Sequence, residues 1–295
     1  MTTAPARGTQ NFPAPSVPTP RQVPAAAIAA MAVRALLLEL ETWPKPGLVS
    51  HMDSGSHGDM DATTFRRSAA AIAPFLRALA EAGSRGRGMG RLRVIGREAE
   101  AAMLAATGGI NTHRGAIFGL GLLAAAAGAK AGGRIRRGLP LGSAVAALWG
   151  AEILDDRIAS LSHGERVRRR YGAGGARLEA ALGFPSVHGI GLPALSRGAR
   201  LRPGDPEAAR VETCFALIAS VEDTNLLHRG GRAGLRFARA AAGEFLGDGG
   251  VGQPGWRERA RQIHESFVAR RLSPGGAADL LAMSLFVEAC EESLL

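Results

Sequence analysis

Apolar residues recur along this chain at the three- and four-residue intervals of an α-helix. The first such stretch covers residues 24–41, and one face carries Ile28, Met31, Ala35, Leu38 and Glu39. The Pro-Lys-Pro-Gly segment at 44–47 cannot continue a helix, so it predicts an ordered loop. The same spacing predicts further helices over residues 61–83, 92–107, 114–130, 140–160, 165–182, 206–222, 233–247, 255–271 and 275–293.

The residue types agree with this pattern. Aromatic residues are 5% of the chain, β-branched runs are few and alanine, leucine and glycine are abundant, which favours helices over strands. Residues 24–295 are therefore predicted to form one compact all-α domain of roughly ten helices, with the longest connection at 183–206. Residues 1–23 are rich in Pro and Ala and are predicted to be a disordered leader.

The formal charge of +10 leaves several kinds of partner open. Arginines cluster at residues 85–93, 134–137 and 166–170, and of these only the last cluster has an aromatic neighbour, Tyr171. Solvated helix faces and loops are the favoured interpretation, with substrate steering or partner docking as the alternative.

Two further features bear on the setting of the protein. Cys214 and Cys290 lie far apart in apolar segments, which predicts buried free thiols. The longest apolar run, residues 115–129, would span only about 22 Å as a helix, too short for a bilayer. No secretory signal pattern opens the chain, so a cytoplasmic protein is expected.

The first polar cluster follows the 44–47 segment. Lys45 precedes His57, Asp59 and Asp61, and the two neighbouring carboxylates could share a divalent cation bound to phosphates. The alternative is that Asp59 or Asp61 caps the helix that follows, while His57 bonds to the loop.

The second polar cluster precedes an apolar helix. Asn111, His113 and Arg114 stand where free backbone N–H groups of the helix start could bind a phosphate. A simple Asn/Thr cap with solvent-facing His113 and Arg114 is the alternative. No Walker A or dinucleotide-binding glycine motif is present.

The third polar cluster combines acidic, amide and basic side chains. Helical spacing predicts that Glu222 and Asn225 share a face, next to Asp223, and that His228 and Arg229 end this helix before two glycines. A salt-bridged helix terminus is the structural alternative.

Six segments in order resemble the triphosphoribosyl-dephospho-coenzyme A synthase family over about residues 30–290. They are 42–49 (TWPKPGLV), 55–60 (GSHGDM), 109–118 (GINTHRGAIF), 171–185, 223–231 (DTNLLHRGG) and 273–282 (SPGGAADLLA).

The resemblance implies an all-helical enzyme that takes ATP and 3′-dephospho-coenzyme A. It would join the triphosphoribosyl group to the 2′-hydroxyl and release adenine. The product would pass to a transferase that modifies the acyl carrier protein of malonate decarboxylase or citrate lyase. Ser50 and Asp53 stand where citrate lyase-associated members have Asp and Asn, so residues 43–51 look closer to the malonate decarboxylase branch.

Such a reaction builds positive charge on the sugar, expels a base and deprotonates a hydroxyl group, while its triphosphate calls for Mg²⁺ and basic groups. Metal binding or stabilisation of the sugar cation is expected from Asp59, Asp61 and Asp223. Glu222 or Asp223 is the expected general base. Substrate binding is expected from Lys45, His57, Asn111, His113, Arg114, Asn225, His228 and Arg229.

Two other functions remain open from sequence. The positive charge would suit a helical RNA-binding or scaffolding protein, although a nucleic-acid or membrane partner is not expected. An ATP-dependent kinase of a pantetheine-type substrate would release ADP in place of adenine. The chain could also be an oligomer.

Overall fold

The computed structural model describes residues 23–136, 138–155 and 174–294. Over these ranges the chain forms eleven α-helices, a π-helical turn (η2), a 3₁₀ turn (η3) and no strand. The elements are α1 (Ala25–Leu40), α2 (Ala62–Ser84), α3 (Met89–Thr107), α4 (Arg114–Ala131), α5 (Leu141–Leu154), α7 (Gly175–Ala181), η2 (Val187–Gly191), α8 (Leu192–Leu201), α9 (Pro206–Ser220), α10 (Thr224–Gly247), η3 (Gly250–Gly252), α11 (Trp256–Ala269) and α12 (Gly275–Leu294). The predicted all-α class is confirmed.

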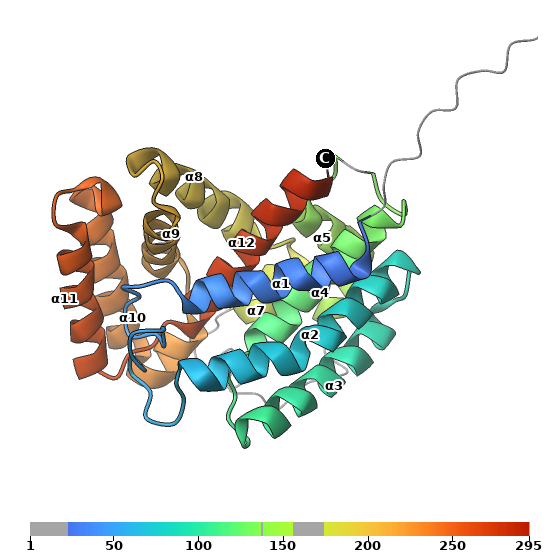
Figure 1. Ribbon diagram of the computed structural model, residues 1–295, viewed down its shortest axis with the longest axis horizontal. Coiled ribbons are helices and arrows are strands. Elements are labelled where there is room, and N and C mark those ends of the chain that lie inside the picture. The colour runs from blue at the N-terminus through green and yellow to red at the C-terminus, as the bar shows by residue number, and fades with distance from the viewer. Residues whose placement is uncertain (1–22, 137, 156–173, 295) are drawn as a thin grey trace, which may run out of the picture.

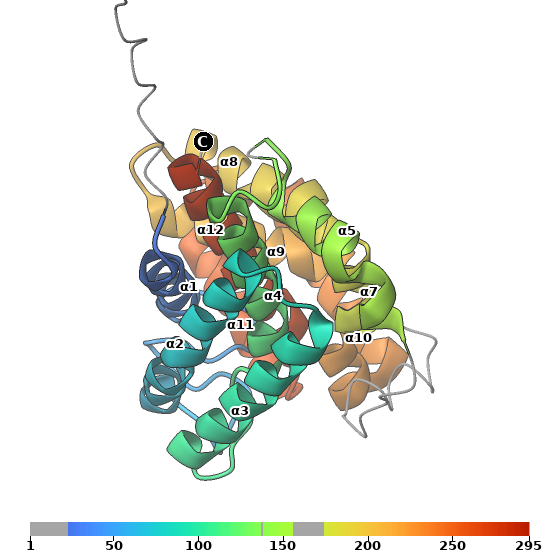
Figure 2. The same cartoon turned by 90° about the vertical axis from the view of Figure 1, so that its right-hand side faces the viewer.

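Helix α4 runs through the middle of the molecule. It packs against α2 and α12 and also contacts α1, α3, α5 and α7 (Figures 1 and 2). Its residues 119–130 are all buried, which explains why this stretch has no polar face. Helices α8 to α11 form the other end of the molecule, with α9 packed on both α8 and α10 (Figure 1).

Glycine and alanine let α2 and α4 touch backbone to backbone. A Cβ atom on Gly128 would lie 1.9 Å from the carbonyl oxygen of Ala80, and one on Gly83 would lie 1.8 Å from that of Ala125. No side chain larger than hydrogen fits at either position. The small residues that favoured helices in the sequence therefore also determine how closely these helices approach.

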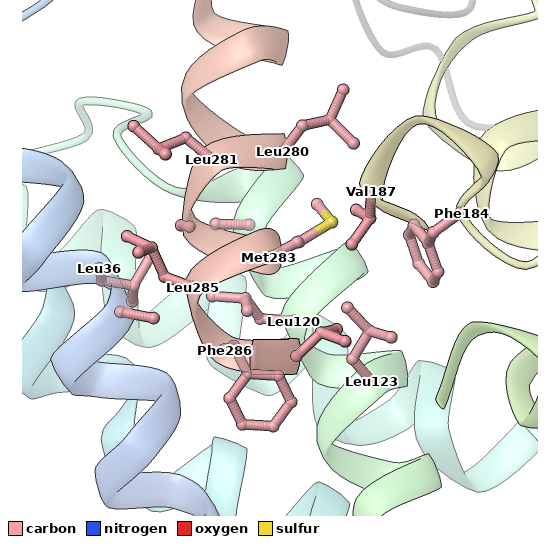
Figure 3. Packing of buried hydrophobic residues seen from close by; sticks show 14 of the residues in the cluster. Leu36, Leu120, Leu123, Phe184, Val187, Leu280, Leu281, Met283, Leu285 and Phe286 are labelled. Carbon is pink, nitrogen blue, oxygen red and sulfur yellow. The ribbon is translucent and has the colours of Figure 1, made fainter. Parts of the chain in front are cut away.

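Helix α12 supplies the larger side chains of the core. Figure 3 shows Phe286 of α12 close to Leu120 of α4, whereas Met283 of the same helix points toward Val187 of η2. All four side chains are buried. Each contributes about 1.5–3 kcal/mol by leaving water, so α12 joins the α1–α2–α4 layer to η2 and α9.

Two sequence predictions about helix positions are wrong. The stretch 183–206, predicted as a connection, contains η2 and α8, because Val187 and Leu195 are buried and Gly198 lies against Ala209 of α9. The predicted helix 206–222 ends at Ser220, and the next begins at Thr224 rather than at 233.

Other predictions meet the limits of the described ranges. Helix α5 ends at Leu154 and α7 begins at Gly175, and the parts of the predicted helices 140–160 and 165–182 between them lie outside the described residues, as do residues 1–22 of the predicted leader. Cys214 and Cys290 are buried free thiols, as predicted. Among the described helices, none combines the length and hydropathy that a membrane span requires.

Candidate active site

The loop between α1 and α2 places a lysine inside the protein. The side chain of Lys45 is fully buried, and its ammonium group donates to the backbone oxygen of Glu39 at 2.6 Å and to the Glu39 carboxylate at 2.5 Å. Burial raises the pKa of Glu39, and the nearby ammonium group partly opposes that shift. Lys45, predicted to bind phosphate, is thus paired with Glu39. The hydrophobic pattern had placed Glu39 on the apolar face of the first helix.

A histidine of α11 fixes the same loop. His264 is buried, with Nδ1 2.6 Å from the Lys45 backbone oxygen and Nε2 3.2 Å from the Asp53 carboxylate. These two contacts hold residues 45–53 of the loop against α11. Both ring nitrogens of His264 thus lie close to an oxygen atom of this loop.

The first and third polar clusters of the sequence meet in space. The Arg229 guanidinium group donates to the backbone oxygens of Ser56 and Arg271, and its Nη2 lies 3.1 Å from Nδ1 of His57. Because guanidinium only donates, Nδ1 accepts and Nε2 carries the ring proton, which it donates to Ser273 Oγ at 2.9 Å. Burial, and then the charge of Arg229, lowers the pKa of His57, which keeps the ring neutral.

The two carboxylates after His57 have different surroundings. Asp61 caps α2: its Oδ1 accepts from the backbone and the hydroxyl group of Thr64, both at 2.8 Å, and these bonds lower its pKa. Asp59 is largely exposed, 3.7 Å from Nδ1 of His57. The capping alternative applies to Asp61, whereas Asp59 is open to a ligand.

Asp223 joins two helix starts. One carboxylate oxygen accepts from the backbone N–H groups of Asn225 at 2.7 Å and Leu226 at 3.2 Å, and the other accepts from Ala277 at 3.0 Å. Asp223 is 2% exposed, and burial raises its pKa against these bonds. The prediction of one helix through this cluster is wrong, because Asp223 begins α10 and links it to α12.

The helix start at Thr224 also changes the positions expected for the neighbours of Asp223. Glu222 precedes the cap and is exposed, while Asn225, His228 and Arg229 lie in the first turns of α10. His228 and Arg229 therefore begin this helix instead of ending one. The left-handed Gly231 then interrupts α10, at φ 56° and ψ −160°.

A third carboxyl group near this centre, that of the partly buried Asp279 on α12, was not among the predicted site residues. It accepts a backbone hydrogen bond from Ala116 at the start of α4, and its Oδ2 lies where a Cβ atom of Gly115 would be, 2.0 Å away. Burial, and then the charges of Glu39 and Asp223, raise its pKa well above the ordinary value. We refer to Asp279, Asp223 and Glu39, which interact electrostatically, as the carboxyl cluster; the ammonium group of Lys45 is bound to Glu39.

A signal for this cluster was present in the sequence. Glu39 occupies an apolar helix face, and Asp279 follows a Ser-Pro-Gly-Gly turn inside an apolar helix. Both are carboxylates where burial was already expected. The sequence does not reveal how close these carboxylates lie, because that distance depends on how four helices pack together.

The second polar cluster lies beside this centre. His113 is buried at the start of α4, with Nδ1 2.6 Å from Ser68 Oγ, and Thr112 donates to the same hydroxyl group at 2.7 Å. Burial, and then the charge of Lys45, lowers the pKa of His113 to about 4. The solvent-facing alternative is wrong for His113, which is a neutral ring at neutral pH.

The other members of that cluster lie further out. Arg114 is half-exposed and pairs with Glu100 at 3.0 Å, and the exposed Asn111 accepts from the Arg114 backbone at 3.2 Å. They form a rim around the start of α4. From here a guanidinium group can reach an anion without desolvation of the whole side chain.

The predicted metal ligands do not form a ready cage. Over the described ranges, no three His, Cys, Asp or Glu side chains are arranged to hold a metal ion. Asp223 is bonded to three backbone N–H groups and Asp61 is a cap, which leaves Asp59 open. One exposed carboxylate suits Mg²⁺ that arrives with substrate phosphates, since this ion commonly keeps few protein ligands.

The site as a whole is a meeting point of helix starts. The N-terminal ends of α4, α10 and α12 converge on Asp223 and Asp279, and His57, Arg229 and Ser273 close one side. Helix starts carry partial positive charge and unpaired N–H groups, so they favour phosphate. The arrangement offers both anion-binding groups and carboxyl groups able to move a proton.

Comparisons with known proteins all indicate the same family. The CitG family, described as ATP:dephospho-CoA triphosphoribosyl transferase, matches residues 25–294. A probable 2-(5''-triphosphoribosyl)-3'-dephosphocoenzyme-A synthase of Pseudomonas paraeruginosa is 42% identical over 92% of each chain. A similarly named protein of Stutzerimonas stutzeri is 43% identical over 91% of this chain and 93% of its own, and the synthase of Klebsiella pneumoniae is 40% identical over 87% and 88%. No solved structure matches.

Proposed function

The chain belongs to the ATP:dephospho-CoA triphosphoribosyl transferase family, and we propose that its carboxyl cluster is where the transfer takes place. The enzyme transfers the triphosphoribosyl group of ATP to the 2′-hydroxyl of 3′-dephospho-CoA and releases adenine. Release of adenine distinguishes this reaction from that of the kinase that the sequence left open. The observation that carries the site assignment is that the buried Glu39 and Asp223 and the partly buried Asp279 interact electrostatically beside one buried ammonium group.

Charge balance supports a stored proton in this cluster. Three ionised carboxylates and the Lys45 ammonium would give the cluster a net charge of −2, a state disfavoured by the burial of Glu39, Asp223 and Lys45. A proton on Asp279 halves that charge. Asp279 has the most raised pKa of the three, so it is the residue proposed to hold the proton before reaction.

The reaction needs one proton donor and one acceptor. The bond between the ribose C1 and adenine breaks, a bond from C1 to the 2′-oxygen forms, the hydroxyl group loses a proton and the adenine gains one. Asp279 is proposed to protonate the departing adenine, and Asp223 to accept the hydroxyl proton. The two carboxyl groups interact electrostatically, so transfer of the proton from one to the other would restore the starting state.

Asp223 also suits the stabilisation of the sugar cation. Three backbone N–H groups hold its carboxylate in a fixed orientation, so no reorganisation is needed when positive charge develops. Glu222, the other predicted base, is exposed and precedes the cap. This difference favours Asp223 in the role.

The triphosphate is proposed to bind at the helix starts. Arg229 with His57 would contact it on one side and Arg114 with Asn111 on the other, while Asn225 and His228 line the start of α10. Bound Mg²⁺ would neutralise part of the phosphate charge, and Asp59 is the carboxylate proposed to hold it. Asp61, Lys45 and His113 would act by positioning, since each is engaged inside the protein.

The destination of the product is a further part of the proposal. Residues 43–51 resemble the malonate decarboxylase branch, and Ser50 here accepts bonds from the backbone of Met52 and Asp53, as a turn residue does. A partner transferase that modifies an acyl carrier protein would take the product. An oligomer remains compatible with this scheme.

Product analysis with matched variants tests the site. Purified protein is incubated with ATP, Mg²⁺ and 3′-dephospho-CoA, and free adenine and the triphosphoribosylated product are measured by mass spectrometry. D223N is expected to lose activity by about 10²–10⁴-fold, whereas E222Q stays within a few-fold of the parent chain. Full activity in D223N would exclude Asp223 as the base, and a large loss in E222Q with activity retained in D223N would assign that role to Glu222.

A further inference from the structure

The turn between α2 and α3 lies at the other end of α2 from the carboxyl cluster. Residues 64 and 84 are separated by 20 positions of one helix, or about 30 Å, and Figure 1 shows this turn on the far side of the molecule. An open pocket of about 410 Å³ lies here. Its floor includes Ala82 and Ile95, and its rim carries Arg85, Arg87 and Arg91.

The charges of this pocket are unbalanced. Its acidic residue, Glu81, already receives Arg77 at 2.9 Å and Arg85 at 3.6 Å. Over the described ranges, the guanidinium groups of Arg87 and Arg91 have no carboxylate within ion-pair distance. Two guanidinium groups therefore face one pocket with no counter-charge from the protein.

The start of α3 adds to the same imbalance. Its N-cap, Gly88, provides no side-chain acceptor, and the first turn contains no acidic residue but does contain Arg91. A helix start favours negative charge, so an anion bound beside Arg91 would be stabilised by both the helix start and the guanidinium group. The pocket is the concave surface where such an anion would meet both arginines.

The turn that carries these arginines is firmly held. Gly86, with φ +65°, allows the backbone of Arg87 to bond to Ala82 at 3.0 Å, and Trp149 of α5 donates to the Arg87 backbone oxygen at 3.3 Å. Arg134 donates to Ser84 at 2.8 Å and stacks its guanidinium group on Gly86. The backbone under the pocket is thus fixed before any ligand arrives.

We propose that this pocket is a second ligand site, which takes the oligophosphate group of a small molecule. The forked donors of arginine match phosphate oxygens in pairs, and the pocket volume falls in the range of small-molecule sites. No aromatic side chain lines the pocket, so it lacks the stacking platform of a single-stranded nucleic-acid site. The proposal is independent of the residue roles assigned to the carboxyl cluster.

Calorimetric titration with inorganic triphosphate tests the proposal. The parent chain is expected to bind two equivalents, and R87Q/R91Q one, with unchanged kcat and KM for ATP. R236Q, which changes an exposed arginine of α10, is the matched control and should bind two. R87K/R91K keeps the charge without the fork and should bind the second equivalent several-fold more weakly. Equal stoichiometry in R87Q/R91Q and R236Q would overturn the site.

Hydrogen exchange on the parent chain gives a test without substitutions. Triphosphate should protect backbone amides of residues 84–92 as well as those near the carboxyl cluster, and protection confined to the latter would overturn the proposal. ATP and triphosphate are compared as separate ligands: equal affinity assigns the pocket to the phosphate chain alone, and ATP at least tenfold tighter makes it a nucleotide site. Random-sequence RNA that displaces triphosphate from residues 84–92 at lower concentration than ATP would overturn the small-molecule assignment.

Discussion

The first turn of α4 and the rest of this helix pack against different kinds of groups. Its first turn meets the carboxyl group of Asp279 and carries the buried His113, whereas residues 117–129 are all Ala, Gly, Leu, Ile or Phe and pack against α2 and α12. Each part contains a glycine that allows a close approach: the Asp279 carboxyl group lies against Gly115, and the backbone of α2 lies against Gly128. Chemistry is thus confined to one end of a helix whose remainder does nothing but fix its position.

Removal of the stored proton should have the largest effect. D279N keeps the size of the side chain but cannot protonate adenine, so kcat should fall by about 10²–10⁴-fold. Folding should survive, because the variant removes an ionisable group whose charged form is disfavoured beside Glu39 and Asp223. Adenine release and urea unfolding of the same preparation measure the two effects, and near-normal kcat would remove Asp279 from the chemistry.

The same variant separates charge from packing through pH. Because the pKa of Asp279 is higher in the folded than in the unfolded chain, its contribution to stability is complete below the unfolded pKa of about 4 and is lost as pH rises through the folded pKa. D279N should therefore gain stability relative to the parent chain between pH 4 and pH 8. A difference in unfolding free energy that does not change with pH would contradict the raised pKa.

A substitution in the apolar part of α4 should lower stability and leave the chemistry unchanged. G128V places side-chain atoms where the Ala80 carbonyl oxygen lies, 1.9 Å from the new Cβ, and should lower the unfolding free energy by about 3 kcal/mol. G96A on α3 is the control, because nothing lies within 4 Å of its Cβ position, and it should stabilise by about 0.5–1 kcal/mol. Folded G128V should turn over normally at low temperature. A selective loss of kcat with no change in Tm would mean that the two parts are not separate.

Two glycines one turn apart sharpen the comparison. A Cβ on Gly115 would meet the Asp279 carboxyl group at 2.0 Å, whereas one on Gly119 would meet the flexible end of Met283, also at 2.0 Å. G115A should displace the carboxyl group and lower kcat by about 10-fold or more, and G119A should leave kcat unchanged because Met283 can move. Equal kcat in both variants would show that the position of Asp279 does not matter.

Sequence reasoning predicted the helices better than their meeting points. Periodicity within one segment was enough for α1, α2, α4 and α12, whose predicted bounds differ from the observed ones by at most one residue. It failed at residues 220–233, where a single aspartate side chain, Asp223, decides that one helix ends and another begins. A local hydrophobic pattern contains no information on which backbone N–H groups an aspartate will cap.

The site divides in the same way. His57 and Arg229 were predicted separately and lie 3.1 Å apart, and Asp223 was predicted and is buried. Glu39 and Asp279 were missed because each looks like part of a helix until α1, α4 and α12 bring them together. Charged residues on otherwise apolar helix faces were the signal that would have found both.

Asp61 gives the smallest expected effect and separates capping from metal binding. Its carboxylate accepts two bonds from Thr64, so D61A should lower the unfolding free energy by about 1 kcal/mol. Serine is an equally good N-cap but a poor Mg²⁺ ligand, and D61S should therefore restore stability. If Asp61 only caps, D61S also restores kcat and the Mg²⁺ dependence of the parent chain. If D61S is stable but needs far more Mg²⁺, the Asp61 carboxylate contacts the metal, and the cap at the start of α2 belongs to the catalytic end of the molecule. D59N is the counterpart, because the exposed Asp59 caps nothing: it should leave the unfolding free energy unchanged and raise the Mg²⁺ requirement.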